Sequence, residues 1–374
     1  MNKIITSFII LLLITSCSSL KTYIPKPELP KAYAFKPLWI KNMDPSYESG
    51  NLPVALQSPL IHEGILYIGQ DSGFMQAFEL ENGRAVWSEF DGSTYHASPV
   101  SYKDQIVYGT VQGRVISRHN ITGKIKYSVD LGASIETKGA VYQGRIFFQL
   151  RNHQIFCLDV ETGKILWGYK RSVSSLTTLQ RASIPVVYKD RVLVGMADGT
   201  LIALSLDEGV VLFETKLSTA SKFQDVDNAA FILNDKIYVG AAGAALSLID
   251  PSTGKILKRA DFIASRAPYI NPLDKSEQLL FGTPTGELIL TDKNINILQK
   301  IKISNGEVTS IAPFKQGFAV STTTGEILFL ETKSLKVVDK FIFGHAYSAV
   351  FGELESKENY LSVFSSRNRL YTFK

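Results

Sequence analysis

A short pattern of apolar runs and turns recurs along most of the chain at intervals of about 40 to 45 residues. In each copy, a run of β-branched, aromatic and other apolar residues ends in a tight turn, usually at a glycine, and a second apolar run follows. Units of this length with four short antiparallel strands are typical of β-propeller blades. The copy that reaches His153 has lost its glycine. The turns fall at Gly73, Gly113, His153, Gly199, Gly243, Gly286, Gly325 and about Asn368.

A second turn follows in most copies, and an aromatic residue comes shortly after it. Glycine suits such turns because it adopts the positive φ that tight hairpins need. The recurrent Thr-Gly-Lys is not a phosphate-binding loop, since it lacks the earlier glycine and the following Ser or Thr of that motif. The turn and aromatic pairs are Gly83 with Trp87, Gly123 with Tyr127, Gly163 with Trp167, and Gly209 with Phe213.

The two ends of the repeated region predict how the ring closes. The last repeat stops at residues 370–374, after its third strand, whereas residues 35–40 look like a fourth strand with Trp39 in the position of Trp87. We therefore expect the N-terminal strand to complete the last blade, which removes open sheet edges. This predicts an all-β, eight-bladed propeller over residues 33–374. Seven blades is the alternative if one weaker repeat is not a blade.

The N-terminal segment is a targeting sequence. Lys3 precedes an apolar run over residues 4–14, which is shorter than the roughly 20 residues of a transmembrane helix. The run ends in Ile-Thr-Ser-Cys17, which resembles a bacterial lipobox, in which the cysteine is lipidated. We therefore expect a signal peptide at 1–16 and a lipidated Cys17 that starts a flexible tether over 17–32. An ordinary secretory signal is the alternative.

Composition and motifs exclude several functional classes. The formal net charge of +5 comes without a run of basic residues, so nucleic acid is not an expected partner. Two cysteines rule out a disulfide scaffold. The five histidines are scattered without metal-ligand spacing, and no hydrolase or metalloprotease motif occurs. We therefore expect no catalytic residue, no metal and no cofactor.

The pattern of Tyr-x-Gly, x-x-Gly and Thr-Gly-Lys-x-x-Trp resembles the repeat of pyrroloquinoline-quinone-type propellers, over nearly the whole mature chain. Joined to the lipobox, it resembles the BamB family of the outer-membrane β-barrel assembly (BAM) machinery. The resemblance implies a non-catalytic lipoprotein scaffold on the periplasmic face of the outer membrane. Its implied partners are the periplasmic domains of BamA, other BAM subunits and unfolded outer-membrane proteins, whose insertion it would assist.

Two loops before innermost strands resemble segments through which the family binds BamA. In the first, Leu176 and Leu179 lie in a polar stretch, and Leu179 matches a family leucine. Arg181 lies one place beyond the family arginine. In the second, Asp225 and Asp227 match an Asp-Val-Asp segment. The resemblance implies that these five residues bind the partner. From the residues alone, the leucines equally suit covering the blade, and the aspartates equally suit capping turns.

Two other functions share the same fold. A quinoprotein dehydrogenase would need calcium held by oxygen ligands and a carboxylate base, and many such enzymes carry a disulfide between adjacent cysteines. This chain has no adjacent cysteines and almost no inserted loops. A lipid-anchored propeller that binds another protein or a cell-envelope ligand is the second alternative, because fold does not fix function.

Overall fold

The structure is a computed structural model of the chain. It describes residues 34–44, 56–173, 182–220, 222–270, 277–344 and 348–374. The expected signal peptide, Cys17, the tether, Leu176, Leu179 and Arg181 therefore lie outside the described residues.

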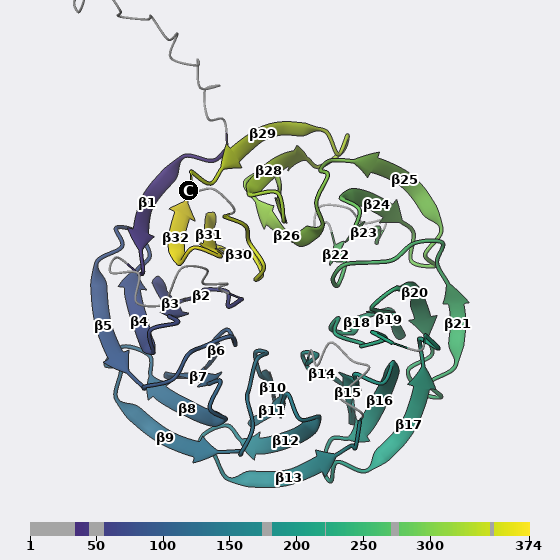
Figure 1. The fold of residues 1–374 in the computed structure, drawn as a ribbon, viewed down its shortest axis with the longest axis horizontal. Coiled ribbons are helices and arrows are strands. Elements are labelled where there is room, and N and C mark those ends of the chain that lie inside the picture. The colour runs from purple at the N-terminus through teal and green to yellow at the C-terminus, as the bar shows by residue number, and fades with distance from the viewer. Residues whose placement is uncertain (1–33, 45–55, 174–181, 221, 271–276, 345–347) are drawn as a thin grey trace, which may run out of the picture. The chain divides into compact units, whose positions relative to one another are not determined.

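The described residues form eight four-stranded antiparallel sheets, arranged as blades around a central axis (Figure 1). This confirms the predicted all-β, eight-bladed propeller. Blade one holds β2 (Leu60–His62), β3 (Ile65–Gly69), β4 (Phe74–Glu79) and β5 (Ala85–Phe90). Blade two holds β6 (Val100–Tyr102), β7 (Gln105–Gly109), β8 (Arg114–His119) and β9 (Ile125–Asp130). Blade three holds β10 (Ala140–Tyr142), β11 (Arg145–Gln149), β12 (Gln154–Asp159) and β13 (Ile165–Lys170).

The remaining blades follow the same order, from the innermost strand outward. Blade four holds β14 (Val186–Tyr188), β15 (Arg191–Gly195), β16 (Thr200–Ser205) and β17 (Val211–Lys216). Blade five holds β18 (Phe231–Leu233), β19 (Lys236–Ala241), β20 (Ala244–Ile249) and β21 (Ile256–Arg259). Blade six holds β22 (Tyr269–Ile270), β23 (Leu279–Gly282), β24 (Glu287–Thr291) and β25 (Ile297–Lys302). Blade seven holds β26 (Val308–Phe314), β27 (Gly317–Thr322), β28 (Glu326–Glu331) and β29 (Val337–Ile342).

Blade eight closes the ring as the sequence predicted. It holds β30 (Glu355–Lys357), β31 (Tyr360–Ser365) and β32 (Arg369–Phe373), and its outermost strand is β1 (Pro37–Asn42). The first and last described strands lie side by side in Figure 1, where purple β1 runs along yellow β32. The pairing is antiparallel, with Ile40 opposite Tyr371.

The turn between the second and third strands of each blade lies where the repeat placed it. Gly73 and Gly113 adopt φ values of 92° and 91°. His153 takes the same place in blade three with a φ of 64°, and Asn368 takes it in blade eight with a φ of 53°. Asparagine and histidine enter this left-handed region more readily than most residues. The turn thus survives the loss of its glycine.

In several blades, an aromatic residue of the outermost strand fastens that blade to the next. Trp87 in blade one donates a hydrogen bond from Nε1 to the carbonyl oxygen of Asn120 in blade two, at 2.7 Å. Its ring lies against Gly123, where a Cβ atom would come within 2.9 Å of the indole. Trp39 repeats this contact across the closure, with Nε1 at 2.9 Å from the carbonyl oxygen of Leu80. The repeated aromatic therefore joins blades rather than serving a ligand.

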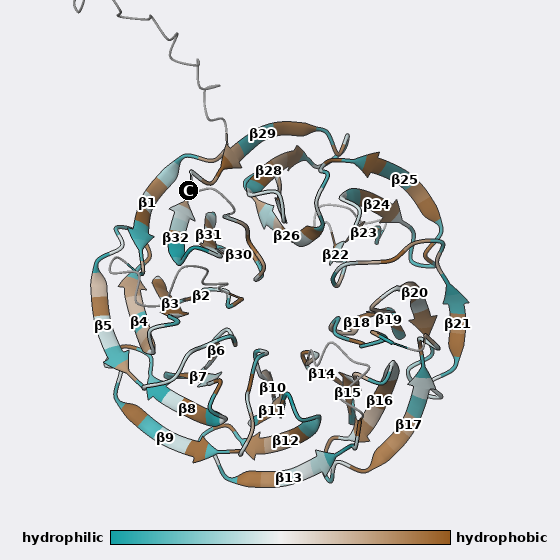
Figure 2. Ribbon diagram, viewed as in Figure 1, coloured by the Kyte–Doolittle hydropathy of each residue, from teal (hydrophilic) through white to brown (hydrophobic). Residues whose placement is uncertain are grey.

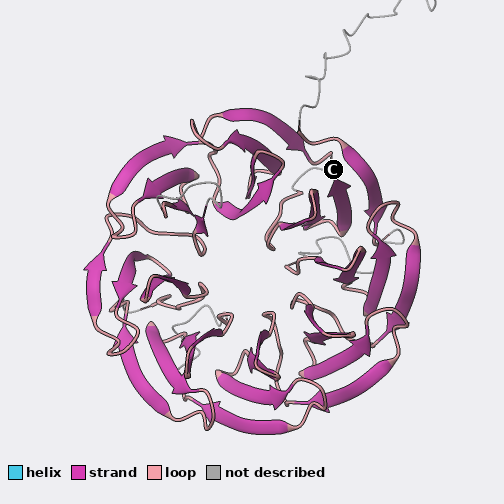
Figure 3. Ribbon diagram, turned by 180° about the vertical axis from the view of Figure 1, so that it is seen from behind, coloured by secondary structure: helices cyan, strands magenta, loops and turns pink. Residues whose placement is uncertain are grey.

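Side chains pack mainly between neighbouring blades, whereas the outer circumference keeps part of its hydrophobic surface exposed. Figure 2 shows hydrophobic stretches along the outermost strands β17, β25 and β29. Leu212 and Leu298, each the second residue of such a strand, are exposed. Figure 3 shows strands and loops throughout, and within the described residues no helix has the length and hydrophobicity to cross a bilayer.

Candidate partner-binding surface

The loop over residues 217–230 links the outermost strand of blade four to the innermost strand of blade five, and it carries both predicted aspartates. Asp225 is fully buried, Val226 is buried beside it, and Asp227 is partly exposed. The structure therefore separates the two carboxylates that the sequence pattern grouped together. Of the two, Asp227 has the side chain within reach of a partner.

Backbone contacts hold this loop against the blades. The N–H of Val226 donates to the carbonyl oxygen of Met196 at 3.1 Å, and the carbonyl oxygen of Asp225 accepts from Ala242 at 2.8 Å. A Cβ atom on Gly195 would lie 2.0 Å from the carbonyl oxygen of Val226, so only glycine permits this approach. The backbone next to Asp227 is therefore held in place without a partner.

Phe223, in the same loop, is a residue that sequence reasoning missed. Its side chain is 53% exposed, and its φ is 54°. A bulky residue at positive φ is unusual, and such conformations cluster at functional positions. The available signal was a lone aromatic residue in the polar stretch that precedes Asp225. Aromatic side chains, phenylalanine among them, are enriched at protein interfaces.

A cluster of charges continues the surface from blade four toward blade three. Arg171 contacts Asp198 at 2.8 Å through Nε, and Glu214 at 2.9 Å through Nη1. Burial lowers the pKa of the nearby His153 imidazole, while the charges of Asp225 and Asp198 act in the opposite direction. Sequence motifs gave no sign of this cluster, because its members come from two blades. Arg171 directly follows β13, Asp198 lies in the turn between β15 and β16, and Glu214 lies in β17.

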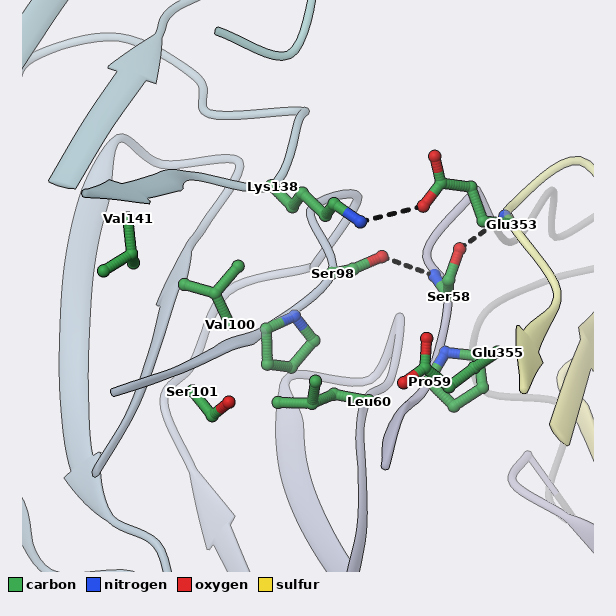
Figure 4. Close-up of a pocket in the computed structure, with 11 residues that line it drawn as sticks. Ser58, Pro59, Leu60, Ser98, Val100, Ser101, Lys138, Val141, Glu353 and Glu355 are labelled. Atoms are coloured by element: carbon green, nitrogen blue, oxygen red, sulfur yellow. Dashed lines mark hydrogen bonds and ion pairs between the residues drawn. The ribbon is translucent and has the colours of Figure 1, made fainter. Parts of the chain in front are cut away.

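A pocket of about 220 Å³ opens on the propeller axis, between the inner strands of blades eight, one, two and three (Figure 4). We call it the axial pocket. Lys138 Nζ lies 2.9 Å from Glu353 Oε2 across it, and Glu355 is also in its wall. The apolar part of the wall is formed by Pro59, Leu60, Pro99, Val100 and Val141.

Among the described residues, no three His, Cys, Asp or Glu side chains are grouped so that they could hold a metal ion. Cys157 is buried in the core, and burial raises the pKa of its thiol to about 12, so it stays protonated and unreactive at neutral pH.

Known proteins resemble this chain in both sequence and fold. The outer membrane protein assembly factor BamB of Bordetella pertussis is 20% identical over 297 residues, which are 77% of this chain and 75% of that protein. The quinohemoprotein alcohol dehydrogenase ADH IIB of Pseudomonas putida is 24% identical over 56% of this chain, but over only 30% of its own length. The aligned region spans about half the length of three further BamB relatives, between 42% and 55%.

The crystal structure of BamB from Moraxella catarrhalis superposes on 91% of this chain with a TM-score of 0.75, at 14% sequence identity, and is itself covered over 99% of its length. This agreement concerns the fold. The family profile described as outer membrane protein assembly factor BamB matches residues 75–312, which is more than half of the chain. This protein therefore belongs to the BamB family of β-propellers.

Proposed function

We propose that this protein is a non-catalytic scaffold of the outer-membrane β-barrel assembly machinery, and that it binds the periplasmic domains of BamA. The observation that carries the proposal is the loop over 217–230, where an exposed aromatic, Phe223, and a partly exposed carboxylate, Asp227, sit on a fixed base. An apolar anchor bordered by a polar rim is the usual composition of a protein interface. The buried Asp225 holds the loop rather than the partner.

The first experiment is a pull-down of the tagged full chain from detergent-solubilised membranes, with identification of the recovered proteins by mass. BamA and other assembly subunits are expected. Their absence, under conditions in which the complex survives, would move the proposal to another protein or cell-envelope ligand.

The site itself is tested by Phe223→Ala combined with Asp227→Asn. We expect BamA affinity to fall by about 2–4 kcal/mol, which is a factor of about 30 or more. The matched control is Ile121→Ala. Ile121 is 58% exposed, but it lies in the turn between β8 and β9, on the face of the propeller opposite to the loop over 217–230. Leu179→Ala probes the neighbouring predicted loop. Equal binding by a folded double variant and the control would reject this surface.

The anchor is proposed at Cys17, since a lipobox-like sequence precedes it. Several acyl chains on one terminus give stable membrane attachment. Cys17→Ala should move the protein from the membrane fraction to the soluble periplasmic fraction. Tight membrane association of the variant would contradict lipidation as the anchor.

Unfolded outer-membrane proteins are the proposed clients. Within the described residues, the outermost strand of each blade pairs on one side only, and Leu212 and Leu298 are exposed there. Such an edge binds an extended segment by strand addition. A photo-crosslinker placed at Leu212 should capture a urea-unfolded barrel protein more strongly than one at Ile121. Equal capture at both positions would argue against the blade edge.

A quinoprotein dehydrogenase is the rival function, because such enzymes share this fold. Pyrroloquinoline quinone carries three carboxylates, and these would meet Glu353 and Glu355 in the axial pocket, with Lys138 as the one cation in its wall. The residues that line the pocket therefore do not fit this polyanionic group. We therefore propose a binding role, without cofactor chemistry, for this protein.

A further inference from the structure

The axial pocket combines a hydrocarbon wall with carboxylates at one side. Pro59, Leu60 and Val100 present apolar surface, while Glu353 and Glu355 enter from blade eight (Figure 4). A cavity of about 150 Å³ holds one benzene molecule. The 220 Å³ here therefore leaves room for a short alkyl chain.

The two carboxylates in the wall of the pocket differ in their partners. Glu353 is paired with Lys138 at 2.9 Å, and Arg266 in blade six also acts on it electrostatically. Glu355 accepts one hydrogen bond, from the N–H of Ile61 at 3.2 Å, and makes no ion pair among the described residues. Burial raises the pKa of Glu355. Glu355 is only partly exposed, and no cation contacts its carboxylate among the described residues, although the charges of Lys138 and Lys357 act on it from a distance. This arrangement favours a cationic ligand.

The pocket is held in shape by contacts between blades. The N–H of Glu353 donates to Ser58 Oγ at 2.5 Å, and the N–H of Ser58 donates to Ser98 Oγ at 2.8 Å. A Cβ atom on Gly352 would lie 2.6 Å from the carbonyl oxygen of Gln57, so blade eight approaches blade one closely here. Three neighbouring blades therefore fix the wall, and a ligand meets a preformed site.

We propose that the axial pocket binds a primary ammonium group on a short aliphatic chain, with the ammonium on Glu355 and the chain along Leu60 and Val100. A lysine side chain of a polypeptide and a free alkylamine share this chemistry. The pocket contains no residue of the loop over 217–230, so this proposal does not depend on the proposed binding of BamA.

The test is an NMR titration of the ¹⁵N-labelled full chain with butylammonium chloride, with Nα-acetyl-lysine methylamide, and with sodium butyrate. Saturable shifts in the amides of residues 98, 100, 101 and 353–355 are expected with the two amines and not with butyrate. Binding of the lysine derivative would identify a polypeptide side chain as the source. Binding of butylammonium alone would identify a free amine.

Two variants give opposite signs, which protects the test from simple misfolding. Glu355→Gln should weaken butylammonium binding about tenfold, since it removes a charged hydrogen-bond acceptor. Lys138→Gln should strengthen it several-fold, because it removes the competing ammonium from the wall. Glu358→Gln is the control, as Glu358 is exposed in the turn between β30 and β31 and does not line the pocket.

Three results would overturn the proposal. The first is the absence of saturable shifts with both amines. The second is butyrate shifting these amides where butylammonium does not. The third is an affinity that Glu355→Gln leaves unchanged while the variant keeps a native spectrum.

Discussion

The contact between Trp87 and Gly123 gives the sharpest test of how one blade is fastened to the next. Gly123 has a φ of 70°, and a Cβ atom added there would lie 2.9 Å from one atom of the indole and 3.0 Å from another. Real Cβ atoms seldom come this close to another heavy atom, so Gly123→Ala forces the indole to move. The hydrogen bond of 2.7 Å from Trp87 to Asn120 would then be strained or lost.

The magnitude follows from comparison with Gly64→Ala. Gly64 has a φ of 72° and open space around the added Cβ, so this variant loses only the about 1–2 kcal/mol that the left-handed conformation costs a residue with a side chain. Gly123→Ala is destabilised by the same amount and by about 1–3 kcal/mol more from overpacking against the indole. A lost hydrogen bond adds about 1 kcal/mol. We therefore expect Gly123→Ala to lower the free energy of unfolding by about 2–4 kcal/mol more than Gly64→Ala does.

Urea denaturation of the two variants, followed by tryptophan fluorescence and circular dichroism, measures this difference. The double variant Trp87→Ala/Gly123→Ala completes a thermodynamic cycle, because the clash vanishes once the indole is absent. Adding Gly123→Ala to the Trp87→Ala background should then cost no more than Gly64→Ala. Equal destabilisation by the two single glycine variants would refute the role assigned to this contact.

Two further predictions concern buried charge. The side chain of Asp91 is 3% exposed and contacts the Arg118 guanidinium at 2.5 Å. Arg118→Leu leaves this carboxylate without its cation, so we expect the free energy of unfolding, measured in urea, to fall by about 3–5 kcal/mol. Arg84→Leu, which removes an exposed ion pair, should change it little. Burial lowers the pKa of His153, so the unfolded chain takes up the proton first as the pH falls below about 6.5, and stability declines from there until the folded pKa is passed. His153→Asn, which tolerates positive φ, should flatten this decline between about pH 7 and pH 5, and an unchanged slope of the urea midpoint would exclude His153 as its cause.

Blade number and ring closure were predictable because both rest on local signals. A turn glycine reports a positive φ at its own position, and Trp39 carries the same local context as Trp87 and Trp167. The turn at His153 was also predictable without its glycine, because apolar runs flank it on both sides as in the other repeats. These features depend on a few neighbouring residues, which a single sequence displays.

The sites were harder to predict because they combine residues from different blades. Asp225 and Asp227 are two positions apart, yet one is buried and the other partly exposed, because the path of the loop is set by Gly195 in another strand. Glu355 and Lys138 meet the same pocket from blades eight and three. Nothing in the sequence near either residue indicates the other.

Closure of the ring by β1 also sets an order of events during folding. Trp39 lies opposite Thr372, about 330 residues further along the chain. At the roughly 5–20 residues per second of synthesis, the first strand waits about 15–70 s before its partner exists. The seven other blades are complete in sequence before β32, the partner of β1, has been synthesised. The strand synthesised first is therefore among the last to be paired, and the earliest residues of the propeller are its latest to fold.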